Sequence, residues 1–205
     1  YNVEVKVVWN MPLLSKQQEV ANVSKANLGI PENKKIIVLQ GAGINIDRGA
    51  EEAVEAMQYV EDAILLIIGS GDVMEVLKQN VASLNLFEKV KFIGKVPFEK
   101  LLQYTRHADL GLTLDKDTNI NYKYSLPNKL FDYIHAGVPV LASDLIEIKM
   151  IIGQYSLGSC ISSHDPTHIA EKMNAILRDE NTLQVWKKNT KIASEKLNWE
   201  LEEKA

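Results

Sequence analysis

Short apolar runs alternate with amphipathic stretches along most of the chain. Five runs rich in Val, Ile and Leu have the length of strands: Ile36–Gln40, Ala63–Ile68, Val90–Ile93, Asp109–Leu114 and Val138–Ala142. Continuous apolar runs of this length are typical of strands that are buried on both faces of a parallel sheet. The pattern therefore predicts a mostly parallel sheet that helices cover on both sides.

The segments between these runs carry apolar residues at helical spacing. Four such stripes predict helices: Ala50, Ala53, Val54, Met57 and Val60; Val73, Val76, Leu77 and Val81, with Asp72 as N-cap; Leu101, Leu102, Thr105 and Ala108; Leu130, Phe131 and Ile134. Strands and helices in alternation indicate an α/β protein with a doubly wound, Rossmann-like sheet.

The two ends of the chain depart from this alternation. Residues 1–34 predict a linker-like segment with a leading strand at Val3–Val8 and a short helix near Gln17–Leu28. Residues 35–178 are expected to form the Rossmann-like domain, closing with a helix at Pro166–Arg178. Residues 179–205 are charged and predict additional C-terminal helices, at about Thr182–Lys196 and Asn198–Lys204.

Composition excludes several classes of protein. The 205 residues are 46% hydrophobic and 24% charged, which are globular proportions. With 23 Lys+Arg against 27 Asp+Glu, the formal net charge of -4 gives no signal for nucleic-acid binding. No apolar run reaches the ~18 residues of a membrane-spanning helix. The chain does not begin with Met, so we expect it to be part of a longer protein.

The cysteine and histidine content bears on redox compartment and metal binding. A single cysteine, Cys160, excludes an intramolecular disulfide and a cysteine-cluster metal site. It fits a reducing compartment, and we expect a cytoplasmic location. The four histidines, His107, His135, His164 and His168, share no metal-ligand spacing, so no metal site is expected.

Glycines follow the first two predicted strands, where doubly wound sheets bind ligands. Gly41 and Gly43 follow the first strand, and Gly69 and Gly71 follow the second. Glycines at such turns let the backbone approach a phosphate, which the N–H groups of a helix N-terminus also attract. The first pair lacks the third glycine of the dinucleotide fingerprint. Tight turns without a ligand are therefore an equal alternative.

The stretch Tyr124–Ser143 is the most informative. Pro127 suits the first turn of a helix, and Gly137 suits its end. Lys129 would lie in the first turn, where a cation is unfavourable unless an anion is present. It therefore indicates a bound phosphate, with a solvated surface lysine as the alternative. Asp132 could accept hydrogen bonds from sugar hydroxyls, or be a plain helix-surface acid.

Together these stretches resemble the retaining glycosyltransferases of family four, which have the GT-B fold. Tyr124–Ser143 resembles the family's acidic motif and the Gly-x-Pro-Val-Val strand after it. Ile36–Gly49 resembles the strand and glycine loop that begin the donor domain, and Ile67–Asp72 its Val-Gly-Asp-Gly turn. Val90–Pro97 resembles the Val-x-Phe-x-Gly-x-Val loop, and Val7–Asn10 the end of the interdomain linker. The set in this order is specific, although no single piece is.

The resemblance implies roles for individual residues. Arg48 falls at the family's Lys that pairs with the diphosphate, and Asp132 at the second Glu, which holds the ribose hydroxyls. Other positions would line the diphosphate loop, meet the base, or face the phosphates and sugar: Gly41 and Gly43, Val96, and Ser125, Leu126 and Pro127, respectively. The alternative for Arg48 is an ion pair with Glu51 or Glu52 on its own helix.

Two positions depart from the family pattern. Ala42 stands where the family has a phosphate-binding Arg, and Tyr124 stands where it has the first Glu, which contacts the donor sugar. A branch of the family with the same loss has a Ser-x-Pro-x-Lys turn, so Lys129 is expected to replace the missing cation. Asp115 and Asp117 could touch the sugar but are expected to be solvated loop acids.

The resemblance implies an enzyme of polysaccharide biosynthesis. The complete protein would transfer a hexose from a nucleotide-diphosphate sugar to an acceptor hydroxyl with retention, and need no cofactor or metal. Arg48 and Lys129 would be the catalytic groups, stabilising the departing diphosphate. This chain would be the C-terminal, donor-binding half and inactive alone. An acceptor sugar or lipid-linked glycan would bind through a missing N-terminal domain, and any peripheral membrane contact would belong to the full-length protein only.

Two other functions stay open at this point. Loss of the first Glu and of the loop Arg is compatible with a non-catalytic module that only binds nucleotide sugar. Sugar-nucleotide epimerases share the same architecture and would change the reaction while keeping the fold. Transfer or hydrolysis of the donor distinguishes the enzyme from the module, and the identity of the product distinguishes the epimerase.

Overall fold

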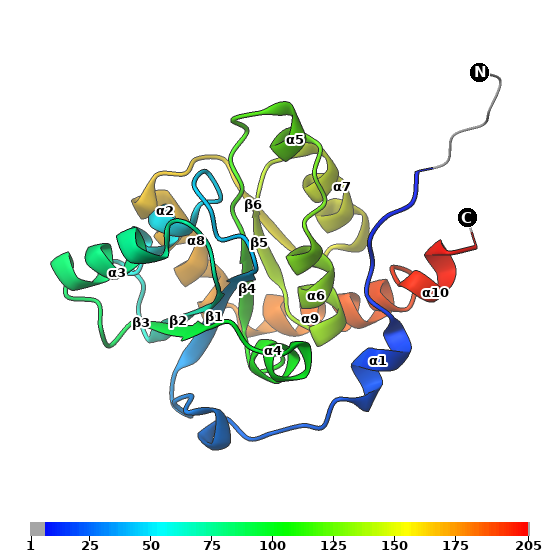
Figure 1. Ribbon diagram of the computed structural model, residues 1–205, viewed down its shortest axis with the longest axis horizontal. Helices are drawn as coiled ribbons and strands as arrows, with labels where there is room; N and C mark the ends of the chain where they lie inside the picture. The colour runs from blue at the N-terminus through cyan, green and yellow to red at the C-terminus, as the bar shows by residue number, and fades with distance from the viewer. Residues whose placement is uncertain (1–6, 205) are drawn as a thin grey trace.

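A computed structural model describes residues 7–204 as a central sheet between helices (Figure 1). The sheet contains β1 (Lys35–Gly41), β2 (Ala63–Gly69), β3 (Val90–Gly94), β4 (Leu110–Thr113), β5 (Val140–Ser143) and β6 (Gly158–Ile161). Its strand order is β3-β2-β1-β4-β5-β6, and every neighbouring pair is parallel. The order reverses between β1 and β4, which makes their carboxyl ends the switch point where such sheets bind ligands.

Helices cover both faces of the sheet. They are α1 (Leu14–Glu19), the 3₁₀ turn η1 (Ala26–Leu28), α2 (Ala50–Ala56), α3 (Met74–Ser83), α4 (Phe98–Thr105), α5 (Ile120–Lys123), α6 (Asn128–Ala136), α7 (Ile146–Tyr155), α8 (Pro166–Arg178), α9 (Glu180–Ser194) and α10 (Trp199–Glu202). None of the helices within residues 7–204 is long and apolar enough to cross a membrane.

Strand side chains alternate between two apolar cores. Ile37 and Leu39 of β1 face a core that includes α2, α3 and α8, while Ile36 and Val38 face a core that includes α6 and α7. Figure 1 shows these two groups of helices on opposite sides of the sheet. Because both faces are covered, each strand needs apolar residues at consecutive positions, which explains the continuous runs in the sequence.

The structure confirms the α/β fold class and all five predicted strands, to within two residues at each end. The helix Pro166–Arg178 has its predicted bounds. The sixth strand, Gly158–Ile161, was missed because Gly-Ser-Cys-Ile carries a single strongly apolar residue. The helices α5 and α7 were missed as well.

Several local predictions are wrong. Asp72 does not cap α3, because its Oδ1 accepts a hydrogen bond from the Ile46 amide at 3.1 Å instead. Val76, assigned to the buried stripe of that helix, is 46% exposed. Pro127 precedes α6 in extended backbone instead of lying in its first turn, whereas Gly137 ends α6 in the left-handed region as expected.

The N-terminal segment also differs from its prediction. The leading strand falls mostly on residues 1–6, outside the described part, and Val7 and Val8 are not in a strand. The helix expected near Gln17–Leu28 is replaced by α1 and η1, which are separate. The predicted C-terminal helices correspond to α9, which begins two residues earlier than expected, and the shorter α10.

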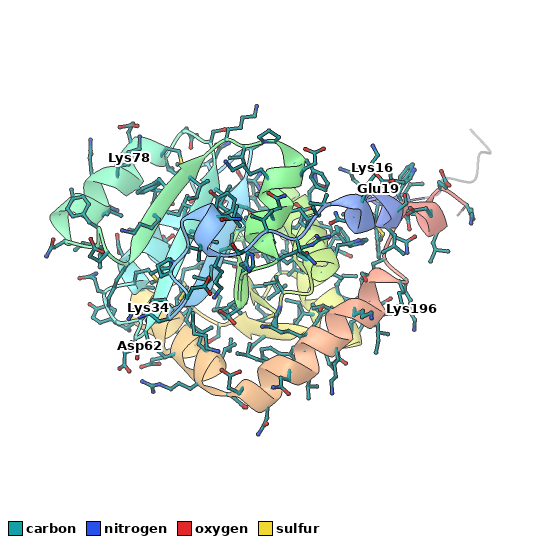
Figure 2. All side chains as sticks on the ribbon, turned by 90° about the horizontal axis from the view of Figure 1, so that it is seen from below. Lys16, Glu19, Lys34, Asp62, Lys78 and Lys196 are labelled. Carbon is teal, nitrogen blue, oxygen red and sulfur yellow. The ribbon has the colours of Figure 1, made fainter. Side chains whose placement is uncertain are left out.

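The helix α10 fastens the N-terminal segment to the domain. The Trp199 amide donates to the Pro12 carbonyl at 3.0 Å, and the Glu200 carboxylate accepts from the amides of Leu14 and Ser15 at 2.9 and 3.0 Å. Figure 2, seen from below, shows α1 with Lys16 and Glu19 beside α10. This anchoring places the segment before α1 next to the start of α6.

The amino ends of the central strands lie away from the switch point. Lys34 and Asp62 directly precede β1 and β2, and their side chains form an ion pair at 3.1 Å (Figure 2). Both side chains are well exposed, so the pair contributes little to stability.

The buried Tyr133 of α6 lies against a glycine of β4. A Cβ added to Gly111 would lie 2.6 Å from the Tyr133 ring, whose hydroxyl lies 3.1 Å from the Leu112 carbonyl and 3.3 Å from the Gln40 amide. Only glycine lets α6 pack this closely on the sheet.

Gly111→Ala is therefore expected to destabilise the fold by about 1–3 kcal/mol through overpacking. Urea unfolding measures the change. Gly153→Ala is the matched control, because this exposed glycine within α7 has no atom within 4 Å of an added Cβ. That variant should gain up to about 1 kcal/mol, since Ala is the better helix former. Equal effects at the two positions would contradict the close contact of α6 with β4.

Candidate functional site

A cavity of about 390 Å³ lies at the switch point of the sheet. The end of β1 and the loop after it form one wall, from Leu39 to Ile44 together with Arg48. The residues Ser125–Lys129, at the start of α6, form the other wall. A second cavity, of about 240 Å³, shares Gly41 and Lys129 with the first. The two cavities therefore adjoin across the glycine turn after β1.

The glycine turn is held against the next strand. The Ser70 amide donates to the Gly41 carbonyl at 3.1 Å, and the Ile44 amide donates to the Ser70 carbonyl at 2.9 Å. A Cβ at Gly71 would lie 1.9 Å from the Ile44 carbonyl oxygen. Gly71 is thus required for backbone packing, which supports the prediction that this glycine serves a tight turn and not a ligand.

A buried ion cluster forms the floor behind the first cavity. Arg48 Nη1 lies 3.0 Å from Asp115 Oδ1, and Lys129 Nζ lies 3.1 Å from Asp115 Oδ2. The Thr113 hydroxyl donates to the same Oδ2 at 3.1 Å. The Arg48 guanidinium also stacks over the Tyr122 ring, 4.7 Å from its centroid. Two cations from distant segments therefore meet on one carboxylate.

The alternative predictions for the two cations, a solvated surface lysine and an ion pair within one helix, are both wrong. The Lys129 side chain is only 10% exposed, so it is not a solvated surface lysine. Burial lowers the pKa of Lys129, and the neighbouring Asp115 carboxylate opposes this shift. Arg48 pairs with Asp115 and not with Glu51 or Glu52; Glu52 pairs instead with Lys116 at 2.5 Å.

Asp132 faces the second cavity from the middle of α6. The Gln40 side-chain amide donates to its Oδ2 at 3.2 Å, and the Thr105 hydroxyl in turn donates to Gln40 Oε1 at 2.7 Å. Burial raises the pKa of Asp132 to about 6, and the Gln40 hydrogen bond offsets part of this shift. The interpretation of Asp132 as a helix-surface acid is therefore wrong.

The structure brings most of the other predicted site residues to these cavities. The first cavity is lined by Gly41, Gly43, Ser125, Leu126 and Pro127, and the second by Val96. Tyr124 is the exception among the positions of the motif. It is 53% exposed and lines a third hollow, beside the N-terminal segment, that shares only Leu126 with the first cavity.

Sequence reasoning missed the two buried polar groups that organise the site. Asp115 was expected to be a solvated loop acid, yet its side chain has no exposure to solvent. The sequence predicts Gln40 as the last residue of an apolar strand, yet its buried side chain donates a hydrogen bond to Asp132. The sequence signal that could identify them is their position. Both residues stand at the carboxyl ends of the central strands, where doubly wound sheets bind ligands.

The histidines of the described residues lie apart and contact other polar groups. Residues 7–204 contain no group of three or more His, Cys, Asp or Glu side chains that could hold a metal ion. His164 Nε2 instead lies 3.0 Å from both the Ser143 hydroxyl and the Leu114 carbonyl, and His135 Nε2 lies 2.7 Å from the Leu197 carbonyl.

Two curated relatives place these observations in a family context. The chain is 26% identical over 182 residues to a phosphatidyl-myo-inositol mannosyltransferase of Mycobacterium leprae, which covers 87% of this chain and 45% of the relative. It is 26% identical over 159 residues to an N-acetyl-alpha-D-glucosaminyl L-malate synthase of Bacillus anthracis, covering 76% of this chain and 39% of the relative. The chain thus spans less than half the length of either relative.

Solved structures share the fold at low identity. The Anabaena protein HepE in complex with UDP superposes with a TM-score of 0.78 at 15% identity, over 97% of this chain and 55% of HepE. WaaG, a glycosyltransferase of lipopolysaccharide biosynthesis, gives a TM-score of 0.72 at 18% identity, over 88% of this chain and 48% of WaaG. The chain therefore shares the Rossmann-like fold of these two solved structures.

The sequence profile of the family described as "Glycosyl transferases group 1" matches residues 21–193, which include the whole sheet and both cavities. This chain belongs to the glycosyl transferases group 1 family.

Proposed function

We propose that this chain is the donor-binding half of a retaining hexosyltransferase. The observation that carries the proposal is the convergence of Arg48 and Lys129 at the wall of one cavity, from segments 81 positions apart in sequence. In this proposal the cavity holds the diphosphate of a nucleotide sugar between the two side chains. The amides at the start of α6 add partial positive charge at the same place.

The second cavity supplies room for the nucleoside. Asp132 would accept hydrogen bonds from the ribose hydroxyls, and the backbone near Val96 would meet the base, as the family resemblance implies. Asp is one methylene shorter than the family's Glu. The Gln40 side chain holds the Asp132 carboxylate at the cavity wall and so fixes where it can reach.

The chemistry follows from where charge develops. As the bond between the anomeric carbon and the diphosphate oxygen breaks, negative charge grows on the departing group. Fixed cations aimed at that oxygen stabilise the transition state, typically by a few kcal/mol each. Arg48 and Lys129 would both act in this way, without a metal.

The acceptor's proton also needs a destination. The described residues that line the first cavity include no carboxylate and no imidazole. We therefore propose that a departing phosphate oxygen takes this proton while the acceptor oxygen bonds the same face of the sugar, which retains its configuration. The acceptor sugar or lipid-linked glycan would bind to a further domain of a longer protein, as the coverage of the relatives suggests.

A second candidate, a module that binds nucleotide sugar without catalysis, is favoured by one observation. Tyr124 stands at the family's first Glu but does not line the first cavity, and the described residues that do line this cavity include no acid that could contact the sugar. Incubating the full-length protein with UDP- and GDP-hexoses separates the two. Transfer or donor hydrolysis supports the enzyme, unchanged donor supports the module, and an epimerised donor supports the epimerase.

The diphosphate assignment predicts that Arg48→Ala and Lys129→Ala each weaken UDP or GDP binding about 10- to 100-fold, which is the loss of one charged hydrogen bond. Isothermal titration calorimetry measures the affinities, and thermal unfolding verifies that each variant folds. Lys123→Ala is the matched control, because this lysine lies on α5 near Arg48 yet lines neither cavity. Wild-type affinity in both cavity variants would refute the assignment.

The ribose assignment predicts a different pattern for Asp132→Asn. At pH 7.5 this variant should bind UDP about tenfold more weakly while its affinity for inorganic pyrophosphate stays unchanged, because pyrophosphate has no ribose. Arg48→Ala should weaken both ligands. Equal losses for UDP and pyrophosphate in Asp132→Asn would contradict contact with the ribose.

Asp132 also predicts a dependence of stability on pH. Its pKa of about 6 in the folded protein lies above the value of 3.8 for an unperturbed Asp, so the folded state holds the proton more tightly. Stability from this group is therefore greatest below about pH 4 and falls as pH rises to about 6. Asp132→Asn should remove this loss and stabilise the protein at pH 7 by on the order of 1–3 kcal/mol. Urea unfolding at pH 4 and pH 7 measures it, with the exposed Asp117→Asn as control; no difference between the two variants would contradict the burial of Asp132.

A further inference from the structure

Asp115 lies behind the first cavity, between the two cations that face it. It stands two residues beyond the end of β4, and its side chain is fully buried. It does not belong to the described residues that line either cavity. Both carboxylate oxygens are engaged, Oδ1 by Arg48 and Oδ2 by Lys129 and Thr113. A group in this position can influence a ligand only through the two cations.

Lys129 depends on this carboxylate for its charge. An ammonium taken out of water is costly unless an anion pairs with it. The charged groups facing Lys129 are Asp115, beyond β4, and Arg48, in the loop between β1 and α2. Burial and Arg48 lower the pKa of Lys129, whereas Asp115 raises it. On its own helix, Asp132 lines the second cavity with it, and the Tyr133 phenol stays protonated because burial raises its pKa.

Arg48 depends on the same carboxylate for its position. Its Nε is buried and has no hydrogen-bond partner among the described residues. The guanidinium is therefore held by its Nη1 contact with Asp115 and by the face of the Tyr122 ring. Tyr122 belongs to the short helix α5, whereas Asp115 directly follows a strand of the sheet. Of the two contacts that hold the guanidinium, the one with Asp115 therefore fixes it relative to the central sheet.

We propose that Asp115 is a positioning residue for donor binding, whose buried carboxylate holds Arg48 and Lys129 as a charged pair at the wall of the diphosphate cavity. Two cations and one carboxylate leave a net positive charge for the ligand. The ligand part of this proposal rests on the proposed function, whereas the hold on Lys129 does not.

The first experiment needs no ligand. Asp115→Asn removes the charge and keeps the shape, so an uncompensated ammonium stays buried at pH 7. The melting temperature of this variant should fall below that of wild type at pH 7, and the difference should shrink as pH rises, because Lys129 without its carboxylate partner releases its proton at a lower pH than in wild type. Thr113→Val removes a hydrogen bond to the same oxygen without removing the charge, and its loss should not change with pH. A loss in Asp115→Asn that does not change with pH, or no loss at all, overturns the proposal.

A double variant covers the outcome in which Asp115→Asn fails to fold. Lys129→Met removes the ammonium and keeps most of the apolar stem. If the single variant fails because of an unpaired charge, Asp115→Asn/Lys129→Met regains a cooperative unfolding transition. If the double variant stays unfolded as well, an unpaired Lys129 charge is not the cause of the failure, and the proposed hold of Asp115 on Lys129 is overturned.

The second experiment measures UDP affinity between pH 7.5 and 9.5 in the full-length protein. Asp115→Asn should bind about tenfold more weakly than wild type at pH 7.5 and lose up to about tenfold more per pH unit as Lys129 deprotonates. Wild type should begin to lose affinity only at a higher pH, because the Asp115 carboxylate raises the pKa of Lys129. A purely structural defect would give no such slope. Wild-type affinity with a flat profile in Asp115→Asn overturns the proposal. If wild type binds neither UDP nor GDP, the proposed function fails, while the ligand-free melting curves still decide whether Asp115 holds Lys129.

Discussion

Burying a carboxylate at the end of a central strand constrains the segments around it. Asp115 follows β4, which pairs with β1 on one side and β5 on the other. A buried carboxylate without partners would cost several kcal/mol, and the cations from the loop after β1 and from the start of α6 offset this cost. Because two cations meet one carboxylate, the cluster at the switch point keeps a net positive charge.

Gly49 lets the loop after β1 pack closely against the end of β4. Its φ of 72° is left-handed, and an added Cβ would lie 2.3 Å from the Leu114 carbonyl oxygen, one residue before Asp115. Any side chain at this position would push the loop that carries Arg48 away from the end of β4. The glycine next to Arg48 thus belongs to the same arrangement as the ion cluster.

The fold could be predicted from sequence where burial alone decides it. Strands covered on both faces need consecutive apolar residues, and five of the six have them. The bounds of α8 were readable because Asp165 caps it, accepting from the amides of Thr167 and His168, and Pro166 follows at the first position. The edge strand β6 lies beyond such reasoning, because its Gly-Ser-Cys-Ile sequence carries little apolar signal.

The candidate site was only partly predictable, for a physical reason. A lysine at the start of a helix indicates an anion nearby, and the structure has one, but it is Asp115 of the chain itself. Local pattern cannot tell a protein carboxylate from a ligand phosphate, since both satisfy the same electrostatic demand. The roles of Arg48 and Lys129 toward a diphosphate therefore stay predictions, whereas their meeting on one carboxylate required the tertiary structure.

The hydrogen bonds between α10 and the N-terminal segment have a mechanical consequence. Glu200 accepts backbone hydrogen bonds from Leu14 and Ser15, which lower its pKa to about 2. The Glu200 carboxylate therefore stays ionised in mild acid, and these hydrogen bonds persist. Asn10 lies four residues before Leu14, and its side-chain amide donates a hydrogen bond to the side chain of Asn128, the first residue of α6. The N-terminal segment thus joins α10 to the first residue of α6, so a displacement of α10 would be transmitted to the end of α6 that carries Lys129.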